Sequence, residues 1–181
     1  MVYVFLADGF EEIEAIGTID VLRRANIEVI TVGVGSKKVK GSHGIEVMAD
    51  AAEDEISPDE RLDAVMLPGG MPGTVNLDKS QKVHELIDYA YSSGKLCAAI
   101  CAAPSVLGHS GILKGKTATC YPGFESELSG ATLSDEYVVQ SGNIITGRGP
   151  GVTVDFALKM VEYLLDEKTA ENIRKGMQCR K

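Results

Sequence analysis

The chain has 181 residues, which is enough for one domain with a substantial core and short of what two domains usually need. Its hydrophobic fraction of 44% and charged fraction of 24% are those of an ordinary soluble globular protein. The net charge of -8 argues against nucleic acid as a partner, because phosphates are bound by surfaces rich in Lys and Arg, and it gives no reason to expect a membrane partner.

The N-terminal residues MVYVFLADG are too short to span a membrane and lack a basic region, so we expect neither a signal peptide nor an anchor. Four cysteines are present, at positions 97, 101, 120 and 179, without a CxxC or Cys/His zinc spacing. This usage favours free thiols in a reducing compartment, which predicts a cytoplasmic protein without a structural metal.

Short apolar runs and longer helical stretches alternate in the first third of the chain. Residues 2–6 fit a buried strand, and residues 11–25 fit a helix with acids in its first turn and Arg23 and Arg24 in its last. Residues 27–34 predict a second strand. The glycine-rich residues 38–47 predict a small hairpin.

The alternation continues to the C-terminus. We expect buried strands at residues 64–67 and 96–100, short strands near 136–140 and 143–146, and helices at 82–92, 104–109, 154–165 and 168–176. Such an order predicts a single α/β domain over residues 1–181, with a mostly parallel sheet covered by helices on both faces.

Cys101 lies where a buried strand passes directly into a helix, in residues 98–104, AAICAAP. Small neighbours are what a sharp, strained turn requires, as in the nucleophile elbow of hydrolases. The positive end of the following helix favours a thiolate, and a pKa lowered by roughly two units corresponds to about 2.7 kcal/mol. A buried structural cysteine is the alternative, and it is the role that we expect for Cys97.

Glu14 is the second candidate residue. Its neighbours on the same helix face, Gly17, Thr18 and Val21, are uncharged, so this face is expected to be partly buried. A carboxyl near a thiolate shares one proton with it, so Glu14 could donate a hydrogen bond to sulfur and carry protons to a substrate. The alternative is a solvated glutamate on a helix surface.

Gly69 and Gly70 follow a buried strand after Pro68. Glycines let the backbone approach a ligand closely, and their N–H groups could form an oxyanion hole together with the N–H of Ala102. A simple turn is the alternative. No GxGxxG or P-loop pattern follows any strand, so nucleotide binding is not supported.

Five segments together resemble the ThiJ/PfpI superfamily, particularly the branch that contains the parkinsonism-associated deglycase and its bacterial relatives. They occur in the order of the family: ADGFEEIE at 7–14, DVLRRA at 20–25, LPGG at 67–70, AICAAP at 99–104 and GRGPG at 147–151. The resemblance implies a flavodoxin-like three-layer sandwich, a homodimer and no cofactor. It maps the nucleophile to Cys101 and the protonated carboxyl partner to Glu14, and it places the N–H groups of Gly70 and Ala102 toward the reacting oxygen.

The sequence departs from the family's pattern at three places. Ala102 stands where the protease and amidase branch has a histidine directly after the cysteine, which counts against peptidase or amidase activity. Cys120 or Tyr121 occupies the place of a histidine of the deglycase branch. His43 replaces an arginine of the hairpin and is expected to face a partner's site, although a solvated loop residue is its alternative. The expected substrate pocket consists of Cys120, Tyr121, His43 and Arg148.

We therefore expect an enzyme that acts on reactive α-oxoaldehydes such as methylglyoxal, or on early glycation adducts, as a glyoxalase III or deglycase does. Cys101 would add to the aldehyde and Glu14 would move the protons. The alternative is a redox-responsive stress protein or chaperone in which Cys101 is oxidised to a sulfinate. A thiamine-pathway enzyme is not supported, because no phosphate-binding loop is evident.

Overall fold

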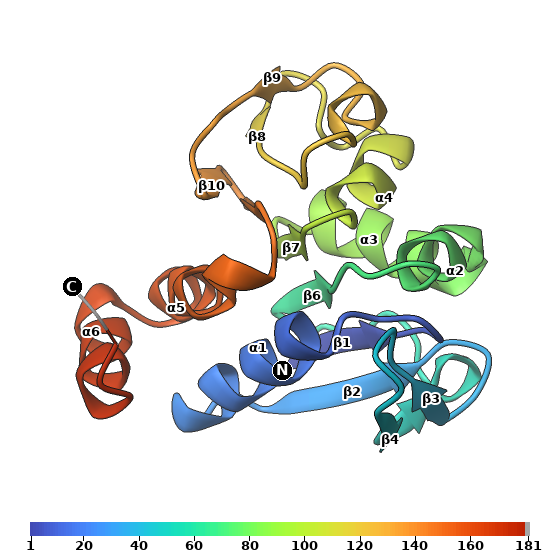
Figure 1. Cartoon of the computed structure of the whole chain (residues 1–181), viewed down its shortest axis with the longest axis horizontal. Coiled ribbons are helices and arrows are strands. Elements are labelled where there is room, and N and C mark those ends of the chain that lie inside the picture. Colours follow the sequence, from blue (N-terminus) through green and yellow to red (C-terminus); the bar gives the residue numbers. More distant parts are fainter. Residues whose placement is uncertain (180–181) are drawn as a thin grey trace.

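The centre of the molecule is a seven-stranded sheet with the strand order β10-β11-β7-β6-β1-β2-β5 (Figure 1). The computed structural model describes residues 1–179. Six strands run parallel, and β10 pairs antiparallel with β11. In sheet order the strands are β10 Val138–Ser141, β11 Ile144–Gly147, β7 Leu96–Ile100, β6 Ala64–Leu67, β1 Val2–Leu6, β2 Val29–Gly33 and β5 Ala51–Ala52.

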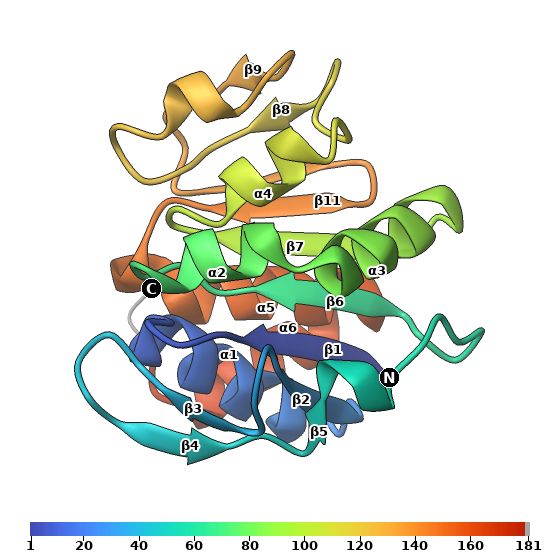
Figure 2. The ribbon, with the colours of Figure 1, turned by 90° about the vertical axis from the view of Figure 1, so that its right-hand side faces the viewer.

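Helices cover both faces of this sheet, so the predicted mostly parallel three-layer sandwich is confirmed (Figure 2). One layer holds α1 Glu12–Arg24, α5 Thr153–Leu164 and α6 Glu167–Gly176. The other holds α2 Gly73–Lys79, α3 Gln81–Ser92 and α4 Pro104–His109. The predicted hairpin is β3 Lys38–Lys40 with β4 Glu46–Met48, and a second small pair joins β8 Thr117–Ala118 to β9 Thr132–Leu133.

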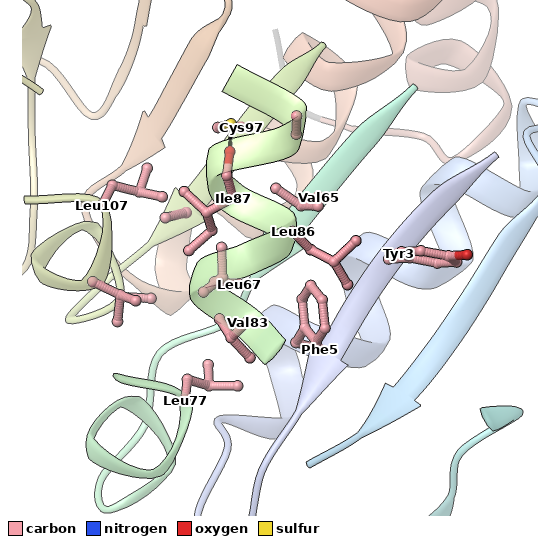
Figure 3. Packing of buried hydrophobic residues seen from close by; sticks show 14 of the residues in the cluster. Tyr3, Phe5, Val65, Leu67, Leu77, Val83, Leu86, Ile87, Cys97 and Leu107 are labelled. Carbon is pink, nitrogen blue, oxygen red and sulfur yellow. Dashed lines mark hydrogen bonds between the residues drawn. The ribbon is translucent and has the colours of Figure 1, made fainter. Parts of the chain in front are cut away.

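Strand residues alternate between two hydrophobic cores, one under each layer of helices. Tyr3 and Phe5 of β1 face α3, whereas Val4 on the same strand faces the layer of α1 and α5 (Figure 3). Cys97 lies in the first of these cores and is fully buried, with its Sγ 3.8 Å from the carbonyl oxygen of Ile87. Its predicted core role is therefore confirmed.

One helix and three very short strands of the structure were not predicted from the sequence. Helix α2 begins at Gly73, directly after Pro72, and a glycine- and proline-rich segment is more typical of a turn. Strands β5, β8 and β9 have two residues each, which is too short to show an alternating pattern. No helix within residues 1–179 has both the length and the apolar character that a membrane crossing requires.

The sheet order brings the predicted site residues to one edge. Strands β7, β6 and β1 are parallel neighbours, so their carboxyl ends lie side by side. Strand β7 leads to Cys101, β6 leads to Gly69, and β1 leads toward Glu14. The chain turns in opposite directions from β1 to β2 and from β6 to β7. The crevice outside this switch point is where open α/β sheets bind their ligands.

Candidate active site

Cys101 occupies the sharp turn that the sequence predicts between β7 and α4. Its φ of 64° is in the left-handed region, which is unusual for a residue other than glycine. Two backbone hydrogen bonds fix the turn: the Cys101 N–H donates to the Gly147 carbonyl at 2.9 Å, and the Tyr121 N–H donates to the Cys101 carbonyl at 2.7 Å. The surrounding loops therefore hold the thiol in a strained backbone position.

Glu14 is fully buried, although it carries an ionisable group. One carboxyl oxygen, Oε2, accepts the N–H of Gly69 at 2.7 Å, while the Glu14 backbone N–H donates to the Glu11 carboxylate at 2.7 Å. The other oxygen, Oε1, is buried without a hydrogen-bond partner among residues 1–179. A solvated surface position, the alternative role for Glu14, is therefore ruled out.

Gly69 separates Glu14 from Cys101 by its backbone alone. A Cβ atom at this position would lie 2.7 Å from the Cys101 Cβ and 2.9 Å from the Glu14 Oε2. Both distances are shorter than van der Waals contact, so any side chain here would displace the thiol or the carboxyl. The missing side chain of Gly69 thus allows the two groups to share one small space.

The expected lowering of the Cys101 pKa is wrong. Burial, together with the charge and hydrogen bond of Glu14, raises the pKa of Cys101 to about 12. Burial likewise raises the pKa of Glu14 to about 7, against the lowering effects of the Gly69 N–H and of Cys101. The expectation considered only the positive end of the following helix and not the repulsion between the two groups. Because of this repulsion, the pair readily carries one negative charge but not two.

Two N–H groups favour the thiolate form. The backbone N–H groups of Ala102 and Gly70 both lower the pKa of the Cys101 thiol. Both N–H groups therefore stabilise negative charge at the position of the sulfur. The expectation for Gly69 as a further donor is wrong, because its N–H already donates to Glu14.

The four expected pocket residues do not lie together. Tyr121 and Arg148 line one pocket of about 190 Å³, whereas Cys120 is buried and absent from its walls. His43 lies in the β3–β4 hairpin, where its Nδ1 is 2.9 Å from the Glu12 carboxylate and its side chain is 72% exposed. Tyr137 also lines the pocket, but it is an isolated aromatic residue in a polar loop and so was not predicted from the sequence.

Glu11, Glu12 and His43 are the residues within 1–179 that bring three possible metal ligands within 4.8 Å of one another. Glu12, however, already accepts hydrogen bonds from the hairpin, including the His43 N–H at 2.8 Å and the Ser42 hydroxyl at 3.2 Å. These bonds anchor the hairpin to the start of α1, and they explain why the carboxylate of Glu12 is buried.

The fold and the site together define an α/β sandwich protein with a cysteine on a sharp strand-to-helix turn and a buried carboxyl beside the thiol. The model of the DJ-1/PfpI family matches residues 1–163, and the chain belongs to this family. It is 40% identical to protein dj-1beta of Drosophila melanogaster over 177 residues, which cover 96% of this chain and 94% of the relative.

Two further comparisons extend this result. A Pyrococcus abyssi protein named as a deglycase is 36% identical over 166 residues, covering 90% of this chain and 98% of that protein. The crystal structure of a cysteine-to-alanine mutant of a DJ-1 superfamily protein from Salmonella typhimurium superposes with a TM-score of 0.94 at 36% identity, covering 99% of this chain and 98% of that one. The flavodoxin-like architecture expected from the resemblance is thus confirmed.

The strain at Cys101 predicts an unusual order of stabilities. Cys101→Gly should have a free energy of unfolding about 1 kcal/mol higher than Cys101→Ala, because only glycine adopts a positive φ without a steric cost. Urea unfolding measures both values. The same pair of substitutions at Cys97, within strand β7, is the control and should give the opposite order. A less stable glycine variant at position 101 would contradict the strained turn.

The shared proton predicts a pH profile with two steps. Site-resolved alkylation of Cys101 by iodoacetamide, followed by mass spectrometry, should rise through about pH 7, where the pair loses its first proton, and rise again only in strong alkali. Below pH 7 both groups are protonated, so the thiol should be unreactive.

Glu14→Gln should remove the step near pH 7 and leave a single titration, because the amide does not ionise. Glu28→Gln, which changes an exposed glutamate, is the matched control and should keep the wild-type profile. Persistence of the step in Glu14→Gln would show that another group titrates there.

Proposed function

We propose that this chain is an enzyme that converts reactive α-oxoaldehydes, or their early glycation adducts, into hydroxy acids. The observation that carries the proposal is the close approach of the Glu14 carboxyl and the Cys101 thiol beside Gly69, which supports a role for Glu14 as proton donor and acceptor. Because the thiol must be reduced to react, we place the activity in the cytoplasm.

The proposed reaction begins with the pair in the form of a thiolate and a carboxylic acid. The sulfur of Cys101 forms a bond to the aldehyde carbon, and the electron pair of the C=O bond moves onto oxygen. The N–H groups of Gly70 and Ala102 stabilise this oxyanion, which takes the proton of Glu14 to give a hemithioacetal.

Glu14 is then a carboxylate and serves as the base. It removes the proton from the carbon attached to sulfur, giving an enediol, and the neighbouring carbon is protonated in its place. The product is a thioester of a hydroxy acid, which water hydrolyses to release the acid and the thiol. Methylglyoxal and one water thus become lactate, without external oxidant or reductant.

An adduct of the aldehyde with an amine or thiol enters the same sequence as a deglycase substrate. Cys101 attacks the carbon that derives from the aldehyde, and the amine or thiol departs. The substrate class is therefore a small aldehyde or a glycated adduct, and neither a metal nor an organic cofactor enters the steps.

Glu14 is the leading proton carrier in this mechanism because the other candidates are poor bases. Burial raises the pKa of Cys120 to about 11, so its thiol stays protonated at neutral pH. Tyr121 is 47% exposed and presents a phenol, which is a hydrogen-bond donor rather than a base at neutral pH. Tyr121, which lines the pocket, is proposed to contact the substrate rather than to replace the histidine of the deglycase branch, whereas the buried Cys120 is not.

A second candidate function is redox sensing, and the exposure of Cys101 favours it. Cys97 and Cys120 are buried, whereas Cys101 is only partly buried and faces two N–H groups. Two molecules of peroxide would convert its thiolate into a sulfinate and release two waters, and the proton of Glu14 would stabilise the product. A stress-protein or chaperone role would follow from this oxidised state.

We further propose that the chain forms a homodimer through α1 and the β3–β4 hairpin. Ile13 and Ile16 on α1 and Ile45 and Met48 of the hairpin are large apolar side chains exposed by 42–69%. The Ile45 N–H donates to the Glu12 carboxylate, so the two groups are parts of one surface. An apolar patch of this kind marks an interface.

Lactate formation from methylglyoxal tests the proposed reaction. The wild type should form lactate, and both Cys101→Ser and Glu14→Gln should lose at least about 100-fold in kcat, as expected for loss of a nucleophile or a general acid–base group. Cys179→Ser is the matched cysteine control and should keep the wild-type rate. No lactate from the reduced wild type, with rapid oxidation of Cys101 by peroxide, would favour redox sensing instead.

Ile13→Glu should convert the proposed dimer into a monomer, because it places a charge in the apolar patch. Size-exclusion chromatography with light scattering measures the change, and Leu133→Glu, at a 52% exposed position on β9, is the control. A wild type that is monomeric at micromolar concentration would contradict the interface.

A further inference from the structure

A pocket of about 190 Å³ lies in the loops that follow β11 and Cys120, and its walls include two aromatic side chains. It is lined by Tyr121, Pro122, Tyr137, Arg148 and residues 149–152. An engineered apolar protein cavity of about 150 Å³ is large enough to bind benzene. The pocket is therefore large enough for one aromatic ring and a few further atoms.

The backbone ties this pocket directly to the nucleophile. The Tyr121 N–H donates to the carbonyl of Cys101, and the Cys101 N–H donates to the carbonyl of Gly147, the residue before Arg148. The two segments that carry the pocket walls thus contact Cys101 from both sides. Cys101 itself does not line the pocket, but its backbone is hydrogen-bonded to the segments that do.

The two tyrosine rings are held in place by their neighbours. Tyr121 lies against Gly149, where a Cβ atom would come within 3.3 Å of the ring. The Arg148 guanidinium lies 5.8 Å from the centre of the Tyr137 ring. The backbone N–H of Arg148 donates to the backbone carbonyl of Tyr137 at 2.9 Å. Both rings are nevertheless 47% and 65% exposed, so they present free apolar surface.

The charge around the pocket selects against cations. The chain carries 26 acidic residues, and four other pockets within residues 1–179 each have at least one carboxylate in their walls. The Tyr121–Tyr137 pocket has Arg148 as its charged residue and no carboxylate among its described lining residues. A neutral aromatic substrate that becomes an anionic product fits this environment.

The geometry points to a subsite for aromatic groups, which makes aryl α-oxoaldehydes, with phenylglyoxal as the simplest, preferred substrates over methylglyoxal. This inference rests on the proposed function for the reaction itself. Phenylglyoxal and one water would become mandelate by the same steps, with the phenyl ring between Tyr121 and Tyr137.

Binding of an unreactive ketone tests the subsite without any turnover. In the Cys101→Ser protein, acetophenone should bind at least about ten-fold more tightly than 2-butanone, measured by saturation-transfer NMR titration. Tyr121→Ala and Tyr137→Ala should each weaken acetophenone binding by about three- to ten-fold, the range that aromatic contacts support. The corresponding Phe variants should retain it, since they keep the ring.

Two further variants test whether acetophenone binds in this pocket. Gly151→Leu should abolish acetophenone binding by filling the pocket, and a Cβ atom there meets nothing within 4 Å, so the fold should tolerate the change. Leu133→Ala, at an exposed apolar position outside the pocket, should bind as the parent protein does. Equal binding of the two ketones, or acetophenone binding that the Ala and Leu variants leave intact, would overturn the subsite.

Turnover provides a separate readout. The ratio of kcat/KM for phenylglyoxal to that for methylglyoxal should exceed one in the wild type and fall about three- to ten-fold in Tyr137→Ala. Selective acetophenone binding without turnover of either aldehyde would overturn the proposed reaction and support the subsite. Turnover of both aldehydes without selective ketone binding would support the proposed reaction and overturn the subsite.

Discussion

The burial of Glu14 is the constraint on which the rest of the site depends. A carboxyl group without solvent exposure is costly to ionise unless donors surround it, and here one oxygen receives the Gly69 N–H while the other has no partner within residues 1–179. A proton on the carboxyl lowers the cost of its burial and removes the like charge that opposes a thiolate at Cys101. The protonation states of Glu14 and Cys101 are therefore coupled.

The backbone around this pair is shaped to bring the two groups together. Gly69 supplies the gap between them, and Cys101 accepts a positive φ that turns its side chain toward this gap. The adjacent parallel strands β1, β6 and β7 supply the three loops. Because each loop is anchored by the sheet, the strain at Cys101 is balanced by the strand pairing and core packing of the whole domain rather than by the loop itself.

The sequence predicted the residues of this site better than their interactions. Small residues around Cys101 and uncharged neighbours of Glu14 are local signals, and both led to the correct geometry. The role of Gly69 was misread because its N–H bonds a carboxylate 55 positions away in the chain. The direction of the Cys101 pKa was wrong for the same reason, since burial and the Glu14 charge depend on tertiary packing. Tyr137 carried no local pattern that could connect it with Tyr121.

The proposed reactivity of Cys101 depends on the position of this cysteine rather than on its acidity alone. Burial raises the pKa of Cys97 and Cys120 to about 12 and about 11, and both are buried beyond the reach of a substrate. The pKa of the Cys101 thiol is raised similarly, but among these three thiols it is the one that has a carboxyl side chain as a hydrogen-bond partner. In the proposed mechanism, Glu14 takes the proton of this thiol, so the thiolate forms through a local proton transfer at neutral pH.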